Sequence, residues 1–386
     1  MTRNDRNLPQ LSDGAMLRGL NGANPLGFLA ALGTLQAVSE ANPDQSVTLA
    51  WQSSDCSWFP VIGGVGTGDF RLAPAVAEQV RCPFRPDERR EQERSAAQQA
   101  HEAKKQQLKQ AMELLKKKAL RGNQRKEAEE KELVPIRQEL AALRWQWLAA
   151  LRQSVASLEI SLGKHLDASR DELRATMLAA LEDGTSANRA ALDLLAAFGS
   201  DACPQPKRDN QMQPTPFCFI TGAGHQYFLD TARQLMKEVD ARRIEEALFG
   251  PTDCSDERLS MRWDPEEDRR YAIMWSDPTS SDNKATTNWA LNLLAYRGLQ
   301  LCTSVPTSKG LRTAGWSFEP ELTWRWPIWR QGLTLDVVRS ALVHPLLMES
   351  NTSRSSLSAI GVVALYEATR VQVGKYINFT PARQIA

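Results

Sequence analysis

The chain has 386 residues, of which 24% are charged and 42% are hydrophobic, and its formal net charge is +1. This composition is ordinary for a globular protein and excludes a fibrous or wholly disordered chain. The length allows two domains, or one large domain with an insertion, either of which can bury a sizeable core. The balanced total excludes a protein that is basic over its whole surface, so any charge asymmetry must be local.

The cysteine pattern and the N-terminal residues indicate the cellular compartment of the protein. The six cysteines contain no CxxC pair, which favours reduced thiols, and we expect no disulfide. The N-terminal residues 1–14 are polar, and no apolar run is long enough to span a bilayer. We therefore expect a cytoplasmic protein without a membrane partner.

Residues 1–85 predict an N-terminal α+β segment. Asn24 is a good N-cap and Pro25 a good first residue for a helix over 26–39. Two strands should follow, ending in the glycine-rich loop Gly63–Gly68. The loop could hold a phosphate, but it lacks the lysine of a P-loop and no clear helix follows it, so we interpret it as a tight turn or a close backbone approach.

Residues 86–162 predict an inserted antiparallel helical hairpin. Glycine almost disappears there, and apolar residues recur in steps of three and four. The two expected seams are Leu108, Met112, Leu115 and Ala119, then Ile136, Leu140, Leu143, Trp147 and Leu151. Gly122 should separate the arms, Pro135 should kink or restart the second, and a first arm over 87–120 would be about 50 Å long.

The rest of the chain predicts a helical layer over 163–200 and a C-terminal α+β domain over 201–386. Ser169 and Glu172 form a capping-box pattern before a helix, and 200–216 is typical of a linker or long loop. Helices are expected over 227–249, 286–299 and 335–342, between short β-like runs such as 217–220 and 322–326. The fold class is therefore α+β: a mixed helix/sheet body with a long inserted helical hairpin.

The strongest functional signal is positive charge at the expected hairpin tip. Between residues 104 and 126 nine cations face one acid, Glu113, a local charge of +8. The cations are Lys104, Lys105, Lys109, Lys116, Lys117, Lys118, Arg121, Arg125 and Lys126. Such a patch would attract nucleic-acid phosphates without reading sequence. The alternative is an ordinary solvated helix surface, although that would interleave both signs and form pairs four residues apart.

Other candidate sites are weaker. None of the four histidines has metal-ligand spacing, and we expect no metal, no cofactor and no catalytic site. His225 lies in a loop that could be catalytic but is more typical of a structural histidine. The carboxylates Asp264, Glu266, Glu267 and Asp268 could act as acid and base, but Asp264–Pro265 favours a turn. Tryptophans such as Trp324 and Trp326 could stack on bases, but alternation favours the core of a sheet.

Several strings resemble a known family. They are LNGANPLGFLAALGTLQAV, GGVGTGDF, GAGHQYF, LSMRWDPEEDRRYAIMWSDP and WRWPIWRQGLTLDVVRSAL, and they cover about a third of the chain. Together they resemble the large, Cas-eight-like subunits of type I CRISPR effector (Cascade) complexes, particularly the I-G (formerly I-U) group. The resemblance implies an antiviral defence protein whose partners are guide RNA, target DNA, other effector subunits and a helicase-nuclease. It does not extend to the hairpin.

The leading hypothesis is thus a non-catalytic nucleic-acid-binding subunit of an RNA-guided complex, which contacts target DNA or guide RNA backbone through the hairpin tip. A second hypothesis is a coiled-coil interaction subunit that binds a partner helix and no nucleic acid. The third is a hydrolase that uses His225 with nearby carboxylates.

Overall fold

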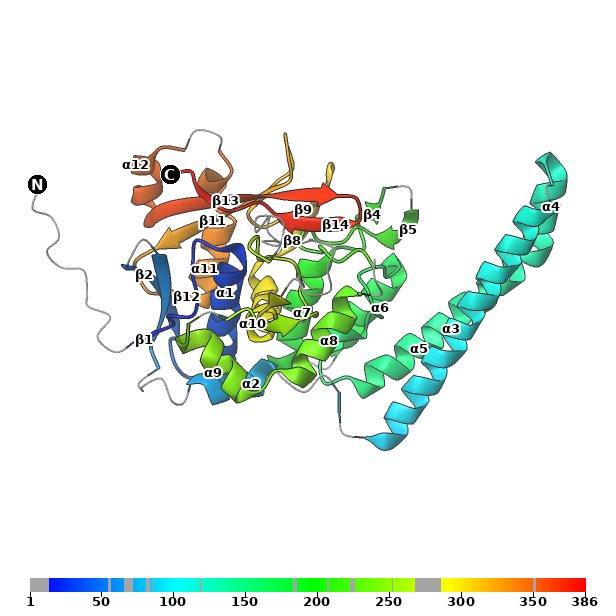
Figure 1. Cartoon of the computed structure of the whole chain (residues 1–386), viewed down its shortest axis with the longest axis horizontal. Helices are drawn as coiled ribbons and strands as arrows, with labels where there is room; N and C mark the ends of the chain where they lie inside the picture. The colour runs from blue at the N-terminus through cyan, green and yellow to red at the C-terminus, as the bar shows by residue number, and fades with distance from the viewer. Residues whose placement is uncertain are drawn as a thin grey trace, which may run out of the picture. The chain divides into compact units, whose positions relative to one another are not determined.

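The chain divides into two compact units in a computed structural model, which describes residues 14–54, 57–65, 72–80, 84–85, 87–118, 120–182, 186–206, 208–222, 226–251, 253–267, 286–349 and 352–386. Unit 1 comprises Met1–Arg81 and Lys164–Ala386, and unit 2 is Cys82–Gly163 (Figure 1). The fold is α+β, as the sequence predicts. Except for Gly163, which belongs to unit 2, the segments 163–200 and 201–386 lie in unit 1 together with residues 1–81, and the stretch 200–216 lies within the same unit.

Antiparallel sheets form the β part of unit 1. The first has the order β1-β3-β2-β12, with β1 Ala15–Met16, β3 Ser57–Gly63, β2 Thr48–Ser54 and β12 Leu333–Thr334. The second has the order β10-β11-β13-β14, with β10 Trp316–Ser317, β11 Thr323–Trp329, β13 Val362–Val373 and β14 Tyr376–Phe379, and β15 Arg383–Gln384 also pairs with β13. Three two-stranded antiparallel sheets pair β4 Pro204–Gln205 with β5 Arg208–Met212, β6 Asp256–Glu257 with β7 Thr286–Thr287, and β8 Ser304–Thr307 with β9 Gly310–Thr313. Because β12 pairs with β2, residues from both ends of the chain share one sheet.

The helices of unit 1 pack beside these sheets (Figure 1). The α-helices are α1 Pro25–Ala41, α2 Leu72–Val80, α6 Arg170–Glu182, α7 Ser186–Phe198, α8 Phe228–Glu238, α9 Ala241–Phe249, α10 Trp289–Gly298, α11 Leu335–Leu342 and α12 Arg354–Ala359. Short 3-10 turns are η5 Leu299–Leu301 and η6 Pro345–Leu347. The capping box before α6 is confirmed, because Ser169 N donates to Glu172 (2.7 Å) and Glu172 N donates to Ser169 Oγ (3.2 Å).

Helix α1 is the centre of unit 1. It begins as the sequence predicts, with Asn24 Oδ1 accepting from Leu26 N (2.8 Å) and Pro25 in the first turn. Every residue from Pro25 to Val38 is buried, so the helix is covered on all sides. Two glycines allow α1 to touch α10: a Cβ on Gly33 would lie 1.8 Å from Leu294 O, and one on Gly298 would lie 2.1 Å from Leu29 O. The two backbones are therefore in direct contact, and neither position has room for a side chain.

An aromatic cluster joins α1 to both large sheets. The ring of Phe28 on α1 stacks on Trp51 of β2 (5.4 Å between centroids) and meets Trp324 of β11 edge-on (5.8 Å). Trp324 and Trp326 stack on each other at 4.7 Å, and both are fully buried. The buried Trp326 Nε1 donates to Gly22 O (2.8 Å), which satisfies its polar atom. The core interpretation of this tryptophan pair is confirmed.

Some expected elements differ from the structure. The single helix expected over 227–249 is two helices, α8 and α9, because Asp240 caps a new start by accepting from Arg243 N (2.9 Å). Residues 217–220 form no strand, although Phe217, Phe219 and Ile220 are buried.

Four cysteines are free thiols, namely Cys203, Cys218, Cys254 and Cys302, while Cys56 and Cys82 lie outside the described residues. Within the described ranges no helix has the length and apolarity needed to cross a membrane.

Candidate nucleic-acid interface

Unit 2 is an antiparallel helical hairpin. Its helices are α3 Glu88–Lys117, α4 Gly122–Glu132 and α5 Val134–Ser154, followed by the 3-10 turn η2 Leu158–Ser161. Helix α3 begins at Asp87, whose carboxylate accepts from Arg90 N (3.2 Å). Helix α3 ends at Lys117, α4 begins at Gly122 (φ +56°), and the second arm restarts at Val134–Pro135. These breaks match the expected positions.

Contacts along the hairpin fix its register. At the open end of the hairpin, Arg85 N donates to Ser154 O (2.8 Å). About halfway along the hairpin, the rings of His101 and Trp147 stack with 5.2 Å between their centroids. At the tip, Lys118 Nζ lies 2.7 Å from the Glu132 carboxylate. The expected seam is partly buried: Leu115, Trp147 and Leu151 are buried, Leu108, Ile136, Leu140 and Leu143 are half-buried, Met112 is exposed, and Ala119 lies outside the described residues. Two helices alone leave one side of each seam open to solvent.

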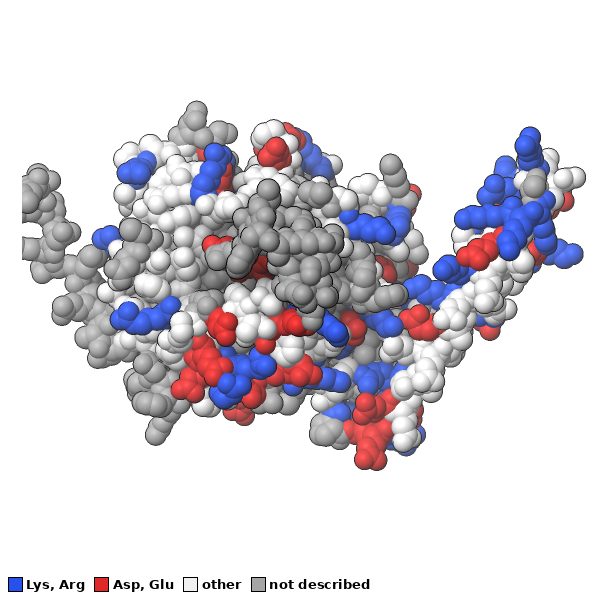
Figure 2. Space-filling model, in the orientation of Figure 1, with Lys and Arg blue, Asp and Glu red and all other residues white. Residues whose placement is uncertain are grey.

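The structure places the nine predicted cations on the distal half of α3, the turn and the start of α4. All nine are exposed except Lys104, which is half-buried. Figure 2 shows Lys and Arg gathered at the α4 end of unit 2. The sequence therefore predicted correctly that these residues share one end of the hairpin.

One part of the charge argument is wrong. The sequence suggested a patch without compensating pairs, but Arg125 pairs with Glu129 one turn later (3.0 Å), and Lys118 pairs with Glu132 across the tip. Lys104 also pairs with Glu139 on α5. The paired acids belong to α4 and α5 and lie outside residues 104–126, the range over which the sequence analysis counted charges. The excess of positive charge is consequently smaller than +8.

Six cations of the tip remain without an acidic partner among the described residues: Lys105, Lys109, Lys116, Lys117, Arg121 and Lys126. We call these six the tip cations. Lys116 and Lys117 also have a structural role, because positive charge in the last turn of α3 complements the helix dipole. Interaction with the helix dipole therefore explains the positions of Lys116 and Lys117, but it does not explain the other four tip cations.

The opposite end of the hairpin has a different charge arrangement. There Arg89 pairs with Glu93 (3.0 Å), Arg90 with Asp87 (3.1 Å) and Arg94 with Glu91 (3.2 Å). About 35 Å of helix separates these pairs from Lys117 at 1.5 Å per residue. Since salt screens charges beyond about 8 Å at physiological ionic strength, the acids of this end do not neutralise the tip.

The weaker candidate sites resolve differently. Gly64 has φ +82° and a Cβ there would lie 2.1 Å from Ser46 O, which agrees with a close backbone approach, while Gly66 and Gly68 lie outside the described residues. His225 and Asp268 also lie outside them. Within the described part of the chain, no group of three or more His, Cys, Asp or Glu side chains could hold a metal ion.

The predicted turn at Asp264–Pro265 is present, but it contains a half-buried acid with hydrogen-bond partners. Asp264 Oδ1 accepts from Glu266 N (3.0 Å) and from the Asn24 side chain (2.9 Å). The Glu267 carboxylate accepts from the hydroxyl groups of Ser260 and Thr287, and burial raises its pKa to about 7. Sequence reasoning missed this environment, because a turn signal carries no information about what folds over it.

Sequence reasoning also missed a cationic pocket in unit 1 that includes Arg262 and Lys375. More than a hundred residues separate the two positions, and although Arg262 lies within one of the strings that carry the family resemblance, Lys375 lies in none of them, so no local signal could have paired the two. A scan against protein-family models, a search of curated proteins and a search of solved structures found no match to this chain.

Proposed function

We propose that the protein is a non-catalytic nucleic-acid-binding subunit of an RNA-guided CRISPR effector complex, and that it holds nucleic-acid backbone with the tip cations. The family resemblance of the sequence suggests the complex, with guide RNA, target DNA and other effector subunits as partners. The observation that carries the proposal is the set of six exposed cations at one end of the hairpin that have no acidic partner within the described ranges.

The chemistry of the tip favours phosphate contacts over base recognition. Lysine ammonium groups are point charges on flexible stems, which suit phosphates along a backbone better than the base edges of a groove. Contacts of this kind release counterions, so the affinity should fall steeply with salt. Six such contacts with duplex DNA would give a slope of about −5 in log K against log salt.

The test is neutralisation of three tip cations in the full chain. A variant with Lys116→Gln, Lys117→Gln and Arg121→Gln should bind a labelled DNA duplex and a labelled single-stranded RNA on the order of 100-fold more weakly at about 0.1 M salt. Its salt slope should become shallower by about 3, one for each lost contact. Fluorescence anisotropy between about 50 and 200 mM salt measures both quantities.

A matched control removes the same charge from unit 1. Arg208, Lys309 and Arg354 are exposed cations without an acidic partner among the described residues, and changing all three to Gln should leave the affinity within about twofold. Equal losses in the two triple variants would show that only the total charge matters, and the tip would then have no special role. Unchanged binding by the tip variant would remove the hairpin from the mechanism.

The complex itself is tested by purification from the native host. The proposal expects a discrete guide RNA among the sequenced co-purifying nucleic acids, together with effector subunits. A random population of cellular RNA would contradict the RNA-guided part of the proposal, while the backbone-binding part would stand on the anisotropy measurements.

Two exposed apolar side chains favour a second candidate, a coiled-coil interaction subunit without direct nucleic-acid binding. On unit 2, Leu114 is 58% exposed and Trp145 is 42% exposed, so both side chains present apolar surface to solvent. A partner helix would cover such side chains. Under this proposal Leu114→Ser with Trp145→Ser abolishes co-purification of the partner, while the tip variant keeps it.

A further inference from the structure

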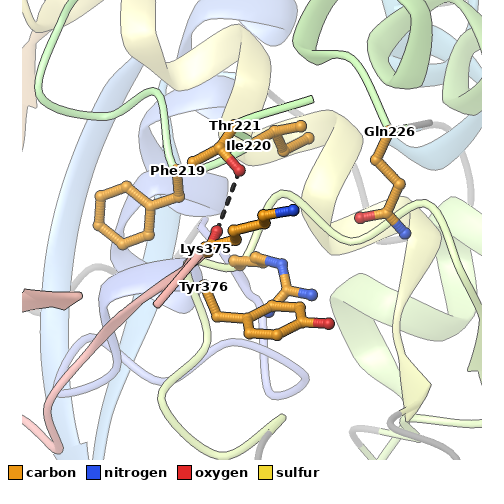
Figure 3. A pocket seen from close by; sticks show the side chains of 7 residues that line it. Phe219, Ile220, Thr221, Gln226, Lys375 and Tyr376 are labelled. Carbon is orange, nitrogen blue, oxygen red and sulfur yellow. Dashed lines mark hydrogen bonds between the residues drawn. The ribbon is translucent and has the colours of Figure 1, made fainter. Parts of the chain in front are cut away.

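A pocket of about 160 Å³ lies in unit 1, where the coil 219–221, Arg262 and the turn between β13 and β14 meet (Figure 3). The turn has two residues, Gly374 and Lys375, between the paired positions Val373 and Tyr376. Gly374 has φ +61°, as the first position of a type II′ turn requires. The Thr221 hydroxyl donates to Lys375 O (3.0 Å), so the coil and the turn are tied together.

The pocket is cationic. Arg262 and Lys375 both line it, and none of the described residues that line it is acidic. Neither cation has an ion pair with a described carboxylate; the only side-chain hydrogen bond described for Arg262 goes from Nη1 to Asn378 Oδ1, at 3.4 Å. Figure 3 shows the Lys375 ammonium group pointing to the side of the pocket where the Gln226 amide lies. An anion placed in the pocket would meet the positive charges of Arg262 and Lys375.

The backbone that presents Arg262 is strained. Arg258, Leu259 and Arg262 have φ values of 66°, 52° and 65°, in a region that costs a residue with a side chain about 1–2 kcal/mol. Such conformations persist where the surroundings hold them, and they concentrate at ligand sites. Here Arg262 N donates to Ser260 Oγ and Met261 N donates to the buried Asn292 side chain, both at 2.8 Å.

One acid of the same loop, Glu267, has a raised pKa. Glu267 interacts electrostatically with Arg262, but burial raises the pKa of Glu267 to about 7, so its carboxyl group is partly protonated at neutral pH. The positive charge of Arg262 is therefore only partly compensated from within the loop, and it remains available to a ligand.

An aromatic ring stands at the rim of the pocket. Tyr376 is 53% exposed, and the guanidinium carbon of Arg262 lies 5.0 Å from the ring centroid. This contact holds the guanidinium over one part of the ring while much of the side chain faces solvent. An exposed aromatic ring beside a cationic pocket is the arrangement that stacks a nucleobase next to its phosphate.

We propose that this pocket binds the phosphate group of a nucleotide, with Arg262 and Lys375 on the phosphate oxygens and Tyr376 against the base. A pocket of about 160 Å³ is similar in volume to cavities that hold benzene, so it accommodates a phosphate group and leaves the base at the rim. The inference is independent of the hairpin tip, since every residue that carries it belongs to unit 1. The phosphate can come from a free mononucleotide or from a nucleic-acid strand.

Calorimetric titration of the full chain with four probes tests the proposal. Adenosine 5′-monophosphate carries a terminal phosphate, the dinucleotide ApA carries one internal phosphodiester, inorganic phosphate lacks the base, and adenosine lacks the phosphate. We expect binding of the mononucleotide or the dinucleotide, with adenosine at least about tenfold weaker than the better of the two, because charge-assisted hydrogen bonds to phosphate are lost. Preference for ApA identifies a strand as the source, and preference for the monophosphate identifies a free nucleotide. Adenosine binding as tightly as both would overturn the proposal, as would no binding of any phosphate-bearing probe.

Three variants localise the binding. Lys375→Gln changes a residue on an exposed turn. This variant and Arg262→Gly should each weaken nucleotide binding about tenfold or more. Arg262→Gly should not lower the melting temperature, because glycine adopts positive φ without strain. The matched control is Arg258→Gly, which makes the same substitution at another positive-φ arginine that does not line the pocket, and its binding should equal that of the wild type. Nucleotide binding that survives both pocket substitutions would place the ligand elsewhere.

A titration of the tip variant tests whether the hairpin contributes to the binding of ApA. Repeating the ApA titration in the tip variant (Lys116→Gln, Lys117→Gln, Arg121→Gln) should give the same affinity. Loss of ApA binding in that variant would assign the dinucleotide to the hairpin and refute a strand site in the pocket.

Discussion

Replacing the half-buried acid Glu267 by glutamine should make the protein more stable at high pH and change little at low pH. In the folded protein, burial raises the pKa of Glu267 from its ordinary value of 4.5 to about 7. The unfolded chain has released this proton by pH 6, whereas the folded protein still holds it. Unfolding therefore releases a proton, and the stability contributed by this group falls as the pH rises between about 4.5 and 7.

The magnitude follows from the size of the pKa difference. One unit of pKa corresponds to about 1.4 kcal/mol, so ionised Glu267 destabilises the folded state by about 3 kcal/mol at pH 8 and by less than about 1 kcal/mol at pH 5. Glutamine has nearly the same shape and no charge. Glu267→Gln should then raise the melting temperature by about 6 °C at pH 8, taking about 2 °C per kcal/mol for a domain of this size.

Thermal unfolding followed by circular dichroism from pH 5 to pH 8 provides the assay. The matched control is Glu245→Gln, which removes an exposed acid of α9 and should give the same small difference from the wild type at every pH. The reasoning is refuted if the gain from Glu267→Gln is the same at pH 5 and pH 8, or if the wild type becomes the more stable protein as the pH rises.

Two further predictions concern packing. Gly33→Ala should destabilise unit 1 by about 3 kcal/mol or more, measured as a lower urea midpoint, because its Cβ would overlap the backbone of α10; a change below about 1 kcal/mol would show that the helices separate easily. In the hairpin, Leu148→Ala should cost about 2–4 kcal/mol, whereas Leu114→Ala should stay within about 0.5 kcal/mol, since the first side chain is buried and the second exposed. Similar losses at both positions would mean that Leu114 is covered in solution.

The hairpin was predictable because its signals are local. Apolar spacing, the loss of glycine, and the breaks at Gly122 and Pro135 each act within a few residues, and the helices begin and end close to these signals. The same holds for the caps at Asn24 and Ser169, where a side chain bonds backbone two or three residues away. Local physics determines these features, so the sequence displays them.

Features that depend on register or on distant contacts were not predictable. The pairing of Lys118 with Glu132 requires the antiparallel alignment of two helices, and a count of charges along the chain cannot contain it. The pocket requires Arg262 and Lys375 to meet through the tertiary fold. The division of 227–249 into two helices is a different case, because its cause is local. The capping residue Asp240 starts the second helix, but the apolar pattern continues past it and therefore predicted one helix.

The way unit 2 begins and ends bears on how this protein can diverge. Phe84 and Val155 face each other in an antiparallel bridge, so the two points where the hairpin leaves and rejoins the chain are neighbours within unit 2. Matched insertions or deletions in both arms leave this junction in place, and each helical turn gained or lost moves the basic end by about 5.4 Å. The length of the arms therefore sets how far the tip cations lie from this junction, and matched changes in both arms alter that distance while the charge of the tip stays the same.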